Sequence, residues 1–455
     1  MKTEIIAAET GYVGSLTPEQ EKKLHQLWGL LLDAFKFDAA ELEAAHPQDP
    51  AAAGSRAEDN GAAPSHHQVD VGQHSVNRVL ADELRRTWLS MLKRENPDGL
   101  LLRFLRARKW DVAQASSMLI NALVWRYKQA RVDEDVLPKG EPWCAQKEKT
   151  GTGNERKYAS EFLEQYRLGK VYLRGVDRRG RPVGYIHLAA HKPGAQSQET
   201  LEKLVVQTIE TARCLFVAPP NEAFCLVFDL TGFSLSNMEW QPVRYIIQAF
   251  EANYPECLGS LLIHNAPWIF SGIWKIIRGL LDPIVASKVD FTRNLDELEK
   301  YIPRENIICR LGGGDNWHYT YHEPGVDEDV YIARVDEREI IQAERREIAR
   351  RLLAATQAWI KHESVGGHKE AIAQEHLRRT EIEALRANYW TLDPYVRSRT
   401  YLDRAGVIRP GGSIEFYPDR KVDVGIRAED EKRRTSGASE ETGVAAHREI
   451  AVAGS

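Results

Sequence analysis

Four basic side chains are set into one short apolar stretch of the chain, Leu101–Val112, which reads LLRFLRARKWDV. Three leucines and a phenylalanine are interleaved there with Arg103, Arg106, Arg108 and Lys109. A surface helix of a globular protein keeps its charged side chains on the face away from the core, whereas this stretch mixes the two kinds. The pattern predicts a basic site beside an apolar wall. Such a site suits an anionic group attached to an apolar molecule, as in an anionic lipid.

A second unusual stretch lies between Trp268 and Val285, where a helix would be apolar on almost every side. Such a helix is either buried in a core or in contact with a membrane. The residue pattern alone favours a central core helix. Two tryptophans, together with Lys275 and Arg278, are also typical of a helix at a membrane surface. The stretch is shorter than the roughly 20 apolar residues that a membrane-spanning helix needs.

Three segments together resemble one known family. Leu101–Val112, with the following helix that ends at Trp125-Arg126, is similar to the N-terminal entry motif of the CRAL-TRIO lipid-binding family. The segment VDRRGRPVGY (Val176–Tyr185) resembles the hairpin of that family, and the run from Tyr254 to Lys288 resembles its strand, gate helix and Ser-Lys segment. The resemblance spans roughly residues 75 to 315. It is greatest to fungal phosphatidylinositol transfer proteins that carry a C-terminal extension.

The resemblance implies a binding site for the headgroup of phosphatidylinositol. In family members that bind this lipid, an Arg of the entry motif, a Glu after Tyr-Pro and a Lys hold the phosphoinositol group, and the matching residues here are Arg108, Glu256 and Lys288. The two cations would meet the phosphate through charge-assisted hydrogen bonds, and the carboxylate would accept from inositol hydroxyls. Cys257 replaces an Arg of the family motif, and Val285 replaces a Thr. These departures predict weaker or altered headgroup binding.

The family also encloses its lipid in an apolar cavity, closed by a lid that opens at a membrane. Phe224, Leu226 and Phe228 would line this cavity. The resemblance assigns the lid and the membrane contact to seven apolar residues: Trp268, Phe270, Ile273, Trp274, Ile277, Leu280 and Leu281.

A second lipid is predicted from what this chain lacks. Members that also carry phosphatidylcholine place Ser and Thr on the central strand, where this chain has Phe224 and Leu226, and tyrosines near the hairpin, where it has Leu173 and Gly184. A choline phosphate would therefore be buried without hydroxyl partners, which is costly. We expect phosphatidylinositol together with a less polar lipid, either a sterol or another neutral isoprenoid.

Composition and charge indicate which partners and which cell compartment to expect. The 455 residues carry a formal net charge of −5, so the protein lacks the basic field that nucleic-acid binding requires. Cys214, Cys225 and Cys257 fall in apolar contexts, which predicts buried free thiols and a reducing compartment. The N-terminal residues do not resemble a secretory signal. We expect a cytoplasmic protein that contacts membranes transiently.

The alternation of strand-like and helix-like segments between Lys170 and Phe291 predicts an α/β cage with a mostly parallel sheet flanked by helices. A helical N-terminal lobe precedes this cage and a helical extension follows it. The predicted regions are an N-terminal helical segment (1–44), a flexible linker (45–75), the N-terminal lobe (76–135), the lipid-binding domain (136–315), the C-terminal helical extension (316–425) and a disordered tail (426–455).

Catalytic and metal chemistry are not expected. The sequence contains no G-x-S-x-G nucleophile elbow, and we predict no catalytic residue, no metal and no cofactor other than a bound phospholipid. Gly151-Thr152-Gly153-Asn154 resembles a phosphate loop, but a structural loop is the simpler interpretation. His318 and His322 lack further metal ligands, and Asp229 is expected to cap a turn.

Two other functions remain open at this point. The first is a lipid-sensing adaptor, in which the charged C-terminal helices would present the bound lipid to a membrane, a kinase or another protein partner. The second is a binder of porphyrin or another small cofactor on the same scaffold.

Overall fold

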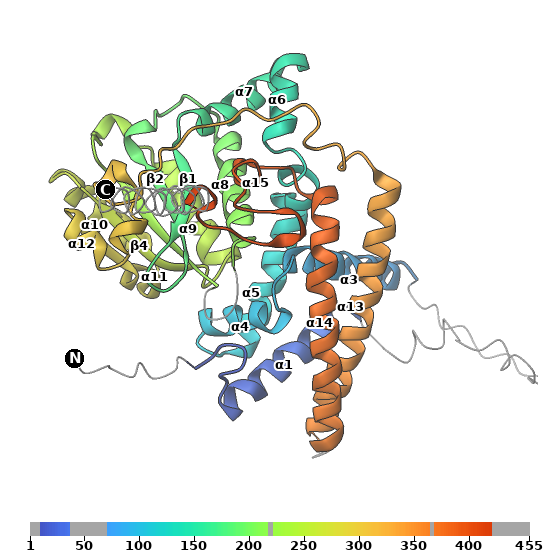
Figure 1. Ribbon diagram of the computed structural model, residues 1–455. Coiled ribbons are helices and arrows are strands. Elements are labelled where there is room, and N and C mark those ends of the chain that lie inside the picture. The colour runs from blue at the N-terminus through green and yellow to red at the C-terminus, as the bar shows by residue number, and fades with distance from the viewer. Residues whose placement is uncertain (1–9, 37–70, 217–221, 365–367, 421–455) are drawn as a thin grey trace, which may run out of the picture.

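The computed structural model describes residues 10–36, 71–216, 222–364 and 368–420. Within these residues a helical N-terminal lobe, a five-stranded sheet covered by helices and a pair of long C-terminal helices pack together (Figure 1). This arrangement confirms the predicted fold class. Residues 45–70 of the predicted linker and the predicted tail 426–455 lie outside the described residues. No helix among the described residues is both long and apolar enough to cross a bilayer.

Local sequence signals set the helices of the N-terminal lobe. Thr17 and Gln20 form a capping box at the start of α1, with Pro18 in its first turn, and Asp111 Oδ1 accepts from the Gln114 backbone N–H (2.9 Å) at the start of α5. The lobe comprises α1 (Pro18–Ala34), α3 (Val71–Leu92), α4 (Pro97–Ala107), α5 (Val112–Val124) and the π-helical turns η1 (Trp125–Gln129) and η2 (Val132–Val136). Two further helices, α6 (Glu141–Thr150) and α7 (Gly153–Arg167), lead to the sheet.

The sheet has the order β1-β2-β3-β4-β5, with β1 antiparallel to β2 and the other neighbours parallel. Its strands are β1 (Val171–Val176), β2 (Pro182–His187), β3 (Phe224–Asp229), β4 (Leu258–His264) and β5 (Val289–Thr292). Side chains alternate between the faces of a strand. Along β3, Phe224, Leu226 and Phe228 line a cavity, whereas Cys225 and Val227 pack into a core on the opposite face. Both faces of this apolar strand are therefore covered, as a parallel strand requires.

Different helices cover the two faces. The cavity face meets α8 (Gln198–Arg213), α9 (Trp240–Asn253) and α10 (Phe270–Leu280). The opposite face packs on α12 (Leu295–Glu299) and on residues that follow it, among them Ile302 and Ile307. The remaining short elements are α11 (Pro283–Ser287), α15 (Tyr401–Arg404), η3 (Leu188–Ala190), η4 (Leu235–Asn237), η5 (Arg304–Asn306), η6 (Cys309–Leu311) and η7 (Pro410–Gly412).

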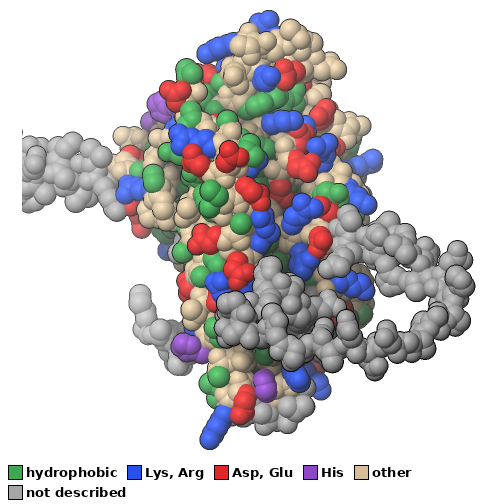
Figure 2. Space-filling model, turned by 90° about the vertical axis from the view of Figure 1, so that its right-hand side faces the viewer, with side chains coloured by type: hydrophobic (Ala, Val, Ile, Leu, Met, Phe, Trp, Pro, Cys, Tyr) green, Lys and Arg blue, Asp and Glu red, His purple; other side chains and the backbone are tan. Residues whose placement is uncertain are grey.

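The C-terminal extension shares its core with the N-terminal lobe. Its long helices are α13 (Val335–Ser364) and α14 (His368–Val396). Leu352 of α13 and Leu385 of α14 belong to one cluster with Leu27 and Leu101. Near the end of α14, Leu392 and Asp393 are buried. Figure 2 shows the face that carries α13, where acidic and basic side chains are interspersed rather than gathered by sign.

Residues after α14 protect the edge of the sheet. The backbone N–H of Leu173 donates to the hydroxyl of Tyr401, and that of Val176 donates to the hydroxyl of Tyr417 (3.0 Å). An exposed edge strand presents unpaired backbone groups that invite aggregation. The ordered segment that follows α14, for which the sequence suggested no role, therefore helps to cover β1.

Candidate functional site

A cavity of about 250 Å³ lies between the sheet and helices α8, α9 and α10. All three residues predicted to line it, Phe224, Leu226 and Phe228, are on its wall. The positions that hold tyrosines in carriers of phosphatidylcholine, here Leu173 and Gly184, lie on the same wall. A Cβ atom added to Gly184 would come within 2.9 Å of Leu226 Cδ2. This part of the wall is therefore both apolar and tightly packed.

Helix α10 forms one side of the cavity with its apolar face, and its outer face exposes two large apolar side chains among polar ones. Four of the predicted gate residues, Phe270, Trp274, Ile277 and Leu281, line the cavity, and Ile273 packs in the adjoining core. The other two, Trp268 and Leu280, are 87% and 43% exposed, and Ile276 beside them is 55% exposed. The central core helix that the residue pattern favoured is therefore excluded, because one side of α10 reaches the surface.

Glu256 and Lys288, two of the predicted headgroup residues, form an ion pair. Lys288 Nζ lies 3.2 Å from Glu256 Oε2, and about a fifth of each side chain is exposed. Glu256 has a φ of +57°, a left-handed conformation that is uncommon for a residue other than glycine. Such strain concentrates at functional sites, and it supports a role for the turn that holds this carboxylate.

The third predicted headgroup residue, Arg108, lies in a neighbouring surface pocket of about 410 Å³. Arg244 and Glu251 of α9 and Leu280 of α10 line the same pocket. Among the described residues, the hydrogen bond recorded for the Arg108 side chain goes to the Ala107 carbonyl (3.4 Å), and none joins it to Glu256 or Lys288. Sequence reasoning missed Arg244, because an isolated Arg on a predicted helix carries no motif.

The other cations of Leu101–Val112 are divided between the interior and the surface. Arg103 is 2% exposed and pairs with Glu95. Arg106 donates to the Gly11 carbonyl (2.7 Å) and lies over the ring of Tyr12. These two cations therefore have partners within the chain, whereas Arg108 faces a pocket. The single basic site predicted for all four cations is thus only partly supported.

A buried polar cluster interrupts the apolar wall of the cavity. Lys170, His191 and Glu239 line the cavity together with Asn237. Lys170 Nζ lies 2.9 Å from His191 Nδ1, and His191 Nε2 lies 2.9 Å from Glu239 Oε2. Burial lowers the pKa of Lys170 to about 8, and burial together with the nearby Lys170 charge lowers the pKa of His191. No local motif in the sequence pointed to this cluster.

The other residues that the sequence raised as possible catalytic, phosphate-binding or metal-binding groups have structural roles or lack the partners for such chemistry. Asp229 Oδ1 accepts from the Thr231 backbone N–H (2.9 Å), so Asp229 caps a turn as expected. The loop at Gly151 and Thr152 joins two helices and follows no strand. His318 Nε2 lies 3.4 Å from Cys309 Sγ, and the described residues contain no group of three side chains suited to a metal. The predicted free thiols of Cys214, Cys225 and Cys257 are buried.

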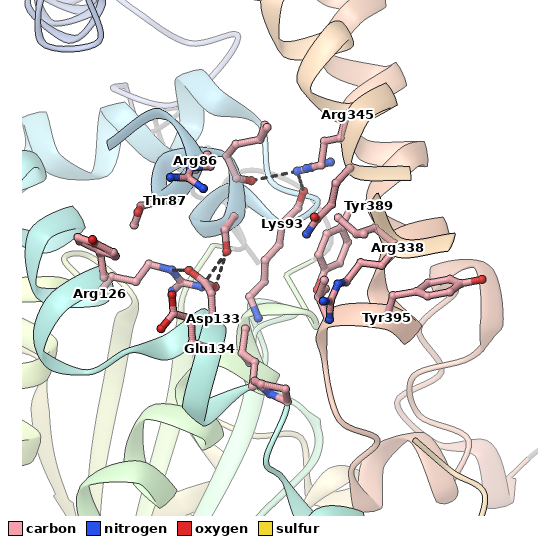
Figure 3. Close-up of a pocket in the computed structure, with 18 of the residues that line it drawn as sticks. Arg86, Thr87, Lys93, Arg126, Asp133, Glu134, Arg338, Arg345, Tyr389 and Tyr395 are labelled. Carbon is pink, nitrogen blue, oxygen red and sulfur yellow. Dashed lines mark hydrogen bonds and ion pairs between the residues drawn. The ribbon is translucent and has the colours of Figure 1, made fainter. Parts of the chain in front are cut away.

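A second, larger cavity of about 680 Å³ separates the N-terminal lobe from α13 and α14 (Figure 3). Its buried cations are held by groups of the chain itself. Arg126 pairs with Asp133 (2.6 Å) and Glu210 (2.8 Å), and Lys93 pairs with Glu210 (3.0 Å). Arg345 of α13 donates to the carbonyls of Lys93 (2.8 Å) and Leu89 (3.2 Å). These contacts join the extension to the lobe, as the dashed lines of Figure 3 show in part.

Comparison with known proteins places this architecture in a family. The model of the CRAL/TRIO domain matches residues 166–313, and that of the CRAL/TRIO N-terminal domain matches residues 23–121. A CRAL-TRIO domain-containing protein of Schizosaccharomyces pombe is 41% identical over 316 residues, covering 70% of this chain and 67% of the relative. The SEC14 cytosolic factor of Eremothecium gossypii is 32% identical over 235 residues, covering 48% of this chain and 69% of the relative.

A further relative also matches outside the two family domains. The phosphatidylinositol transfer protein CSR1 of Eremothecium gossypii is 34% identical over 448 residues, covering 88% of this chain and 99% of the relative. Because 88% of the chain cannot fit within residues 1–313, the match includes part of the C-terminal extension. From its two domain matches and these relatives, the chain belongs to the CRAL-TRIO family.

Proposed function

We propose that this protein binds phosphatidylinositol in the apolar cavity and exchanges it between membranes. The observation that carries the proposal is the pairing of an apolar cavity with a helix, α10, whose cavity side is apolar and whose outer side exposes the large apolar side chains Ile276 and Leu280 beside cations. One relative of nearly the same length is a phosphatidylinositol transfer protein. The role needs no covalent chemistry, and we expect the protein to act in the cytoplasm with transient contact to membranes.

The energetics of lipid transfer explain why a closed cavity is useful. Burial of each CH₂ group is worth about 0.8 kcal/mol, so two long acyl chains represent on the order of 20 kcal/mol. A lipid therefore leaves a bilayer slowly when its chains must enter water. A protein cavity offers the chains equivalent burial, and a lid that opens only against the bilayer keeps them from water during exchange.

Helix α10 has the features of such a lid. Trp268, Ile276 and Leu280 form an exposed apolar surface on its outer side, and Lys275 and Arg278 beside them are exposed. Exposed apolar groups flanked by cations are typical of helices that insert into the boundary of an anionic membrane. We expect this side to enter the membrane surface while the side with Trp274 and Ile277 moves away from the cavity.

The headgroup would bind where Glu256 and Lys288 approach the surface. Lys288 would exchange its bond to Glu256 for one to the lipid phosphate, and Glu256 would then accept from inositol hydroxyls. Arg108 and Arg244 line the adjacent pocket and would add positive charge near the phosphate. Cations that meet phosphate form stronger hydrogen bonds than neutral pairs do.

Substitution of Lys288 tests this function. Lys288→Ala should lower the transfer of phosphatidylinositol between vesicles by at least about tenfold, since one charge-assisted bond is worth roughly 1.5–3 kcal/mol. The circular dichroism spectrum and the thermal midpoint should stay as in the wild type. Normal transfer by the folded variant would refute the assignment of the headgroup site.

A further inference from the structure

We propose that Glu239, held by His191, which in turn contacts Lys170, binds the hydroxyl group of a neutral lipid that occupies the same cavity. This inference rests on the proposed function, because it takes the cavity to be a lipid site. It adds the chemical class of the second ligand, an apolar molecule with a hydroxyl group at one end, and the residue that recognises it.

The hydrogen bonds within the cluster determine which group is left for a ligand. Lys170 Nζ donates to Gln165 Oε1 and Gln196 Oε1 and contacts His191 Nδ1. An ammonium group has three N–H donors, so all three are used. Because Lys170 can only donate, His191 Nδ1 must accept, and the ring proton lies on Nε2. That N–H donates to Glu239 Oε2 (2.9 Å).

The group left over is a hydrogen-bond acceptor. Glu239 Oε1 has no hydrogen-bond partner within the described part of the chain, and 23% of the Glu239 side chain is exposed. Glu239 is also the residue before the first turn of α9, yet its side chain makes no capping bond to that helix. A capping bond typically contributes about 1 kcal/mol. The carboxylate therefore contacts His191 and lines the cavity, and it is not engaged by its own helix.

An acceptor of this kind selects among lipids. A phosphate or a carboxylate brings a negative charge and further acceptors, which a carboxylate repels. Choline has no N–H or O–H to donate. A lipid ammonium would bring a second cation into the neighbourhood of Lys170, whose pKa burial already lowers. A hydroxyl group donates one hydrogen bond and adds no charge, and the rest of the ligand can contact the apolar wall formed by residues such as Leu201, Val243 and Phe270.

The position of the cluster separates it from the predicted headgroup site. Glu256 and Lys288 precede the amino ends of β4 and β5, whereas His191 and Glu239 follow the carboxyl ends of β2 and β3. The carbonyl of Lys170 accepts from the His187 backbone N–H (2.9 Å), which places Lys170 beside the carboxyl end of β2. Because β2 to β5 are parallel, one group lies at the amino ends of the strands and the other at their carboxyl ends. A six-residue strand is about 20 Å long.

The test compares a fluorescent sterol that has a free hydroxyl group with the methyl ether of the same sterol. Both are offered in phosphatidylcholine vesicles to the wild type and to Glu239→Leu, and binding is read from energy transfer between tryptophan and sterol. A fluorescent diacylglycerol with a free hydroxyl is a second probe. The wild type should prefer the free sterol to its ether about ten- to hundredfold, the range expected for one hydrogen bond to a charged group.

Substitution of Glu239 should remove this preference. Glu239→Leu should bind the free sterol and its ether equally, and Glu239→Gln, which keeps an acceptor oxygen, should recover part of the preference. Glu199→Leu is the matched control, since Glu199 is a 70% exposed carboxylate on α8 that pairs with Lys203. Preference for diacylglycerol over sterol would assign the site to a glycerolipid alcohol and would support the hydroxyl recognition itself.

Two results would overturn the proposal. The first is equal binding of the free sterol and its ether by the wild type, with no binding of diacylglycerol. The second is loading of phosphatidylcholine or phosphatidylethanolamine from the same vesicles in place of a hydroxyl lipid. Transfer of phosphatidylinositol is measured in parallel. If it persists while hydroxyl preference is missing, this inference alone is wrong, whereas loss of both in the folded wild type would refute the proposed function.

Discussion

The two polar groups differ in the burial of their basic side chains, although the side chains of Glu239 (23% exposed) and Glu256 are exposed to a similar extent. Glu256 and Lys288 form one ion pair with about a fifth of each side chain exposed. Lys170 is 6% exposed and His191 is 9% exposed, and both belong to a network that also includes Gln165 and Gln196. A partly exposed pair can exchange its partner for a ligand at low cost. A buried network that has satisfied its donors is expensive to break.

This difference suggests how one cavity can serve two lipids. In the proposed account, a charged headgroup would stay near water at the end of the sheet that carries Glu256 and Lys288, while its acyl chains enter the cavity. The hydroxyl group of a neutral lipid would instead find its acceptor, Glu239, at the other end. The two ligands would then share the apolar space and differ in the end at which their polar group binds.

The largest expected effect compares the two groups by their stability. Lys170→Met leaves the acceptors of Gln165, His191 and Gln196 without a donor, and it should lower the free energy of unfolding by about 1–3 kcal/mol. Lys288→Ala removes a partly exposed pair and should cost less than about 1 kcal/mol. Urea unfolding of both variants measures the difference. If both variants lost the same free energy of unfolding, the contrast between the buried network of Lys170 and the partly exposed pair of Lys288 would be contradicted.

The next effect concerns α10, the proposed lid of the cavity. Ile276→Asp removes an apolar side chain from its outer surface, and the lost insertion of roughly 1.5–3 kcal/mol should slow transfer between vesicles about tenfold or more. Ile340→Asp is the matched control, because Ile340 is 71% exposed on α13. If both substitutions slow transfer equally, the membrane contact is not specific to α10. If only Ile340→Asp slows it, the C-terminal extension contacts the membrane or a partner.

A third expected effect is a change in the pH dependence of stability. The pKa of Lys170 is lowered to about 8 from its ordinary value of 10.5, because burial disfavours the ammonium. Between these pH values the unfolded chain holds a proton that the folded chain has released, so Lys170 makes the free energy of unfolding rise with pH. Subtracting the curve of Lys170→Met from that of the wild type isolates this slope. Parallel curves from pH 8 to 10.5 would show that Lys170 titrates normally in the folded protein.

The sequence predicted those features that depend on neighbours along the chain. The caps at Thr17 and Asp111, the apolar strand that begins at Phe224 and the apolar helix between Trp268 and Leu281 all follow from local patterns. The likeness to a family added Glu256 and Lys288, which the structure brings into contact.

Features that depend on distant partners could not be predicted. Arg103 and Arg108 have similar sequence contexts but different environments. Arg103 pairs with Glu95, whereas Arg108 lines a surface pocket. The cluster at Glu239 joins residues from three separate segments. Truncation after Asp315 would test the adaptor function only if the remaining domain stayed folded, but the helices of the extension complete the core of the N-terminal lobe. Deletion would therefore expose Leu27 and Leu101, and surface substitutions are the cleaner test of an adaptor.

The central claim is that the apolar cavity carries phosphatidylinositol, and the direct measurement is mass spectrometry of lipid extracted from the purified full-length protein. The account predicts phosphatidylinositol in near-stoichiometric amount in the wild type and a strongly reduced amount in Lys288→Ala. A wild-type protein that is folded, contains no phosphatidylinositol and takes none from vesicles of that lipid would contradict the account.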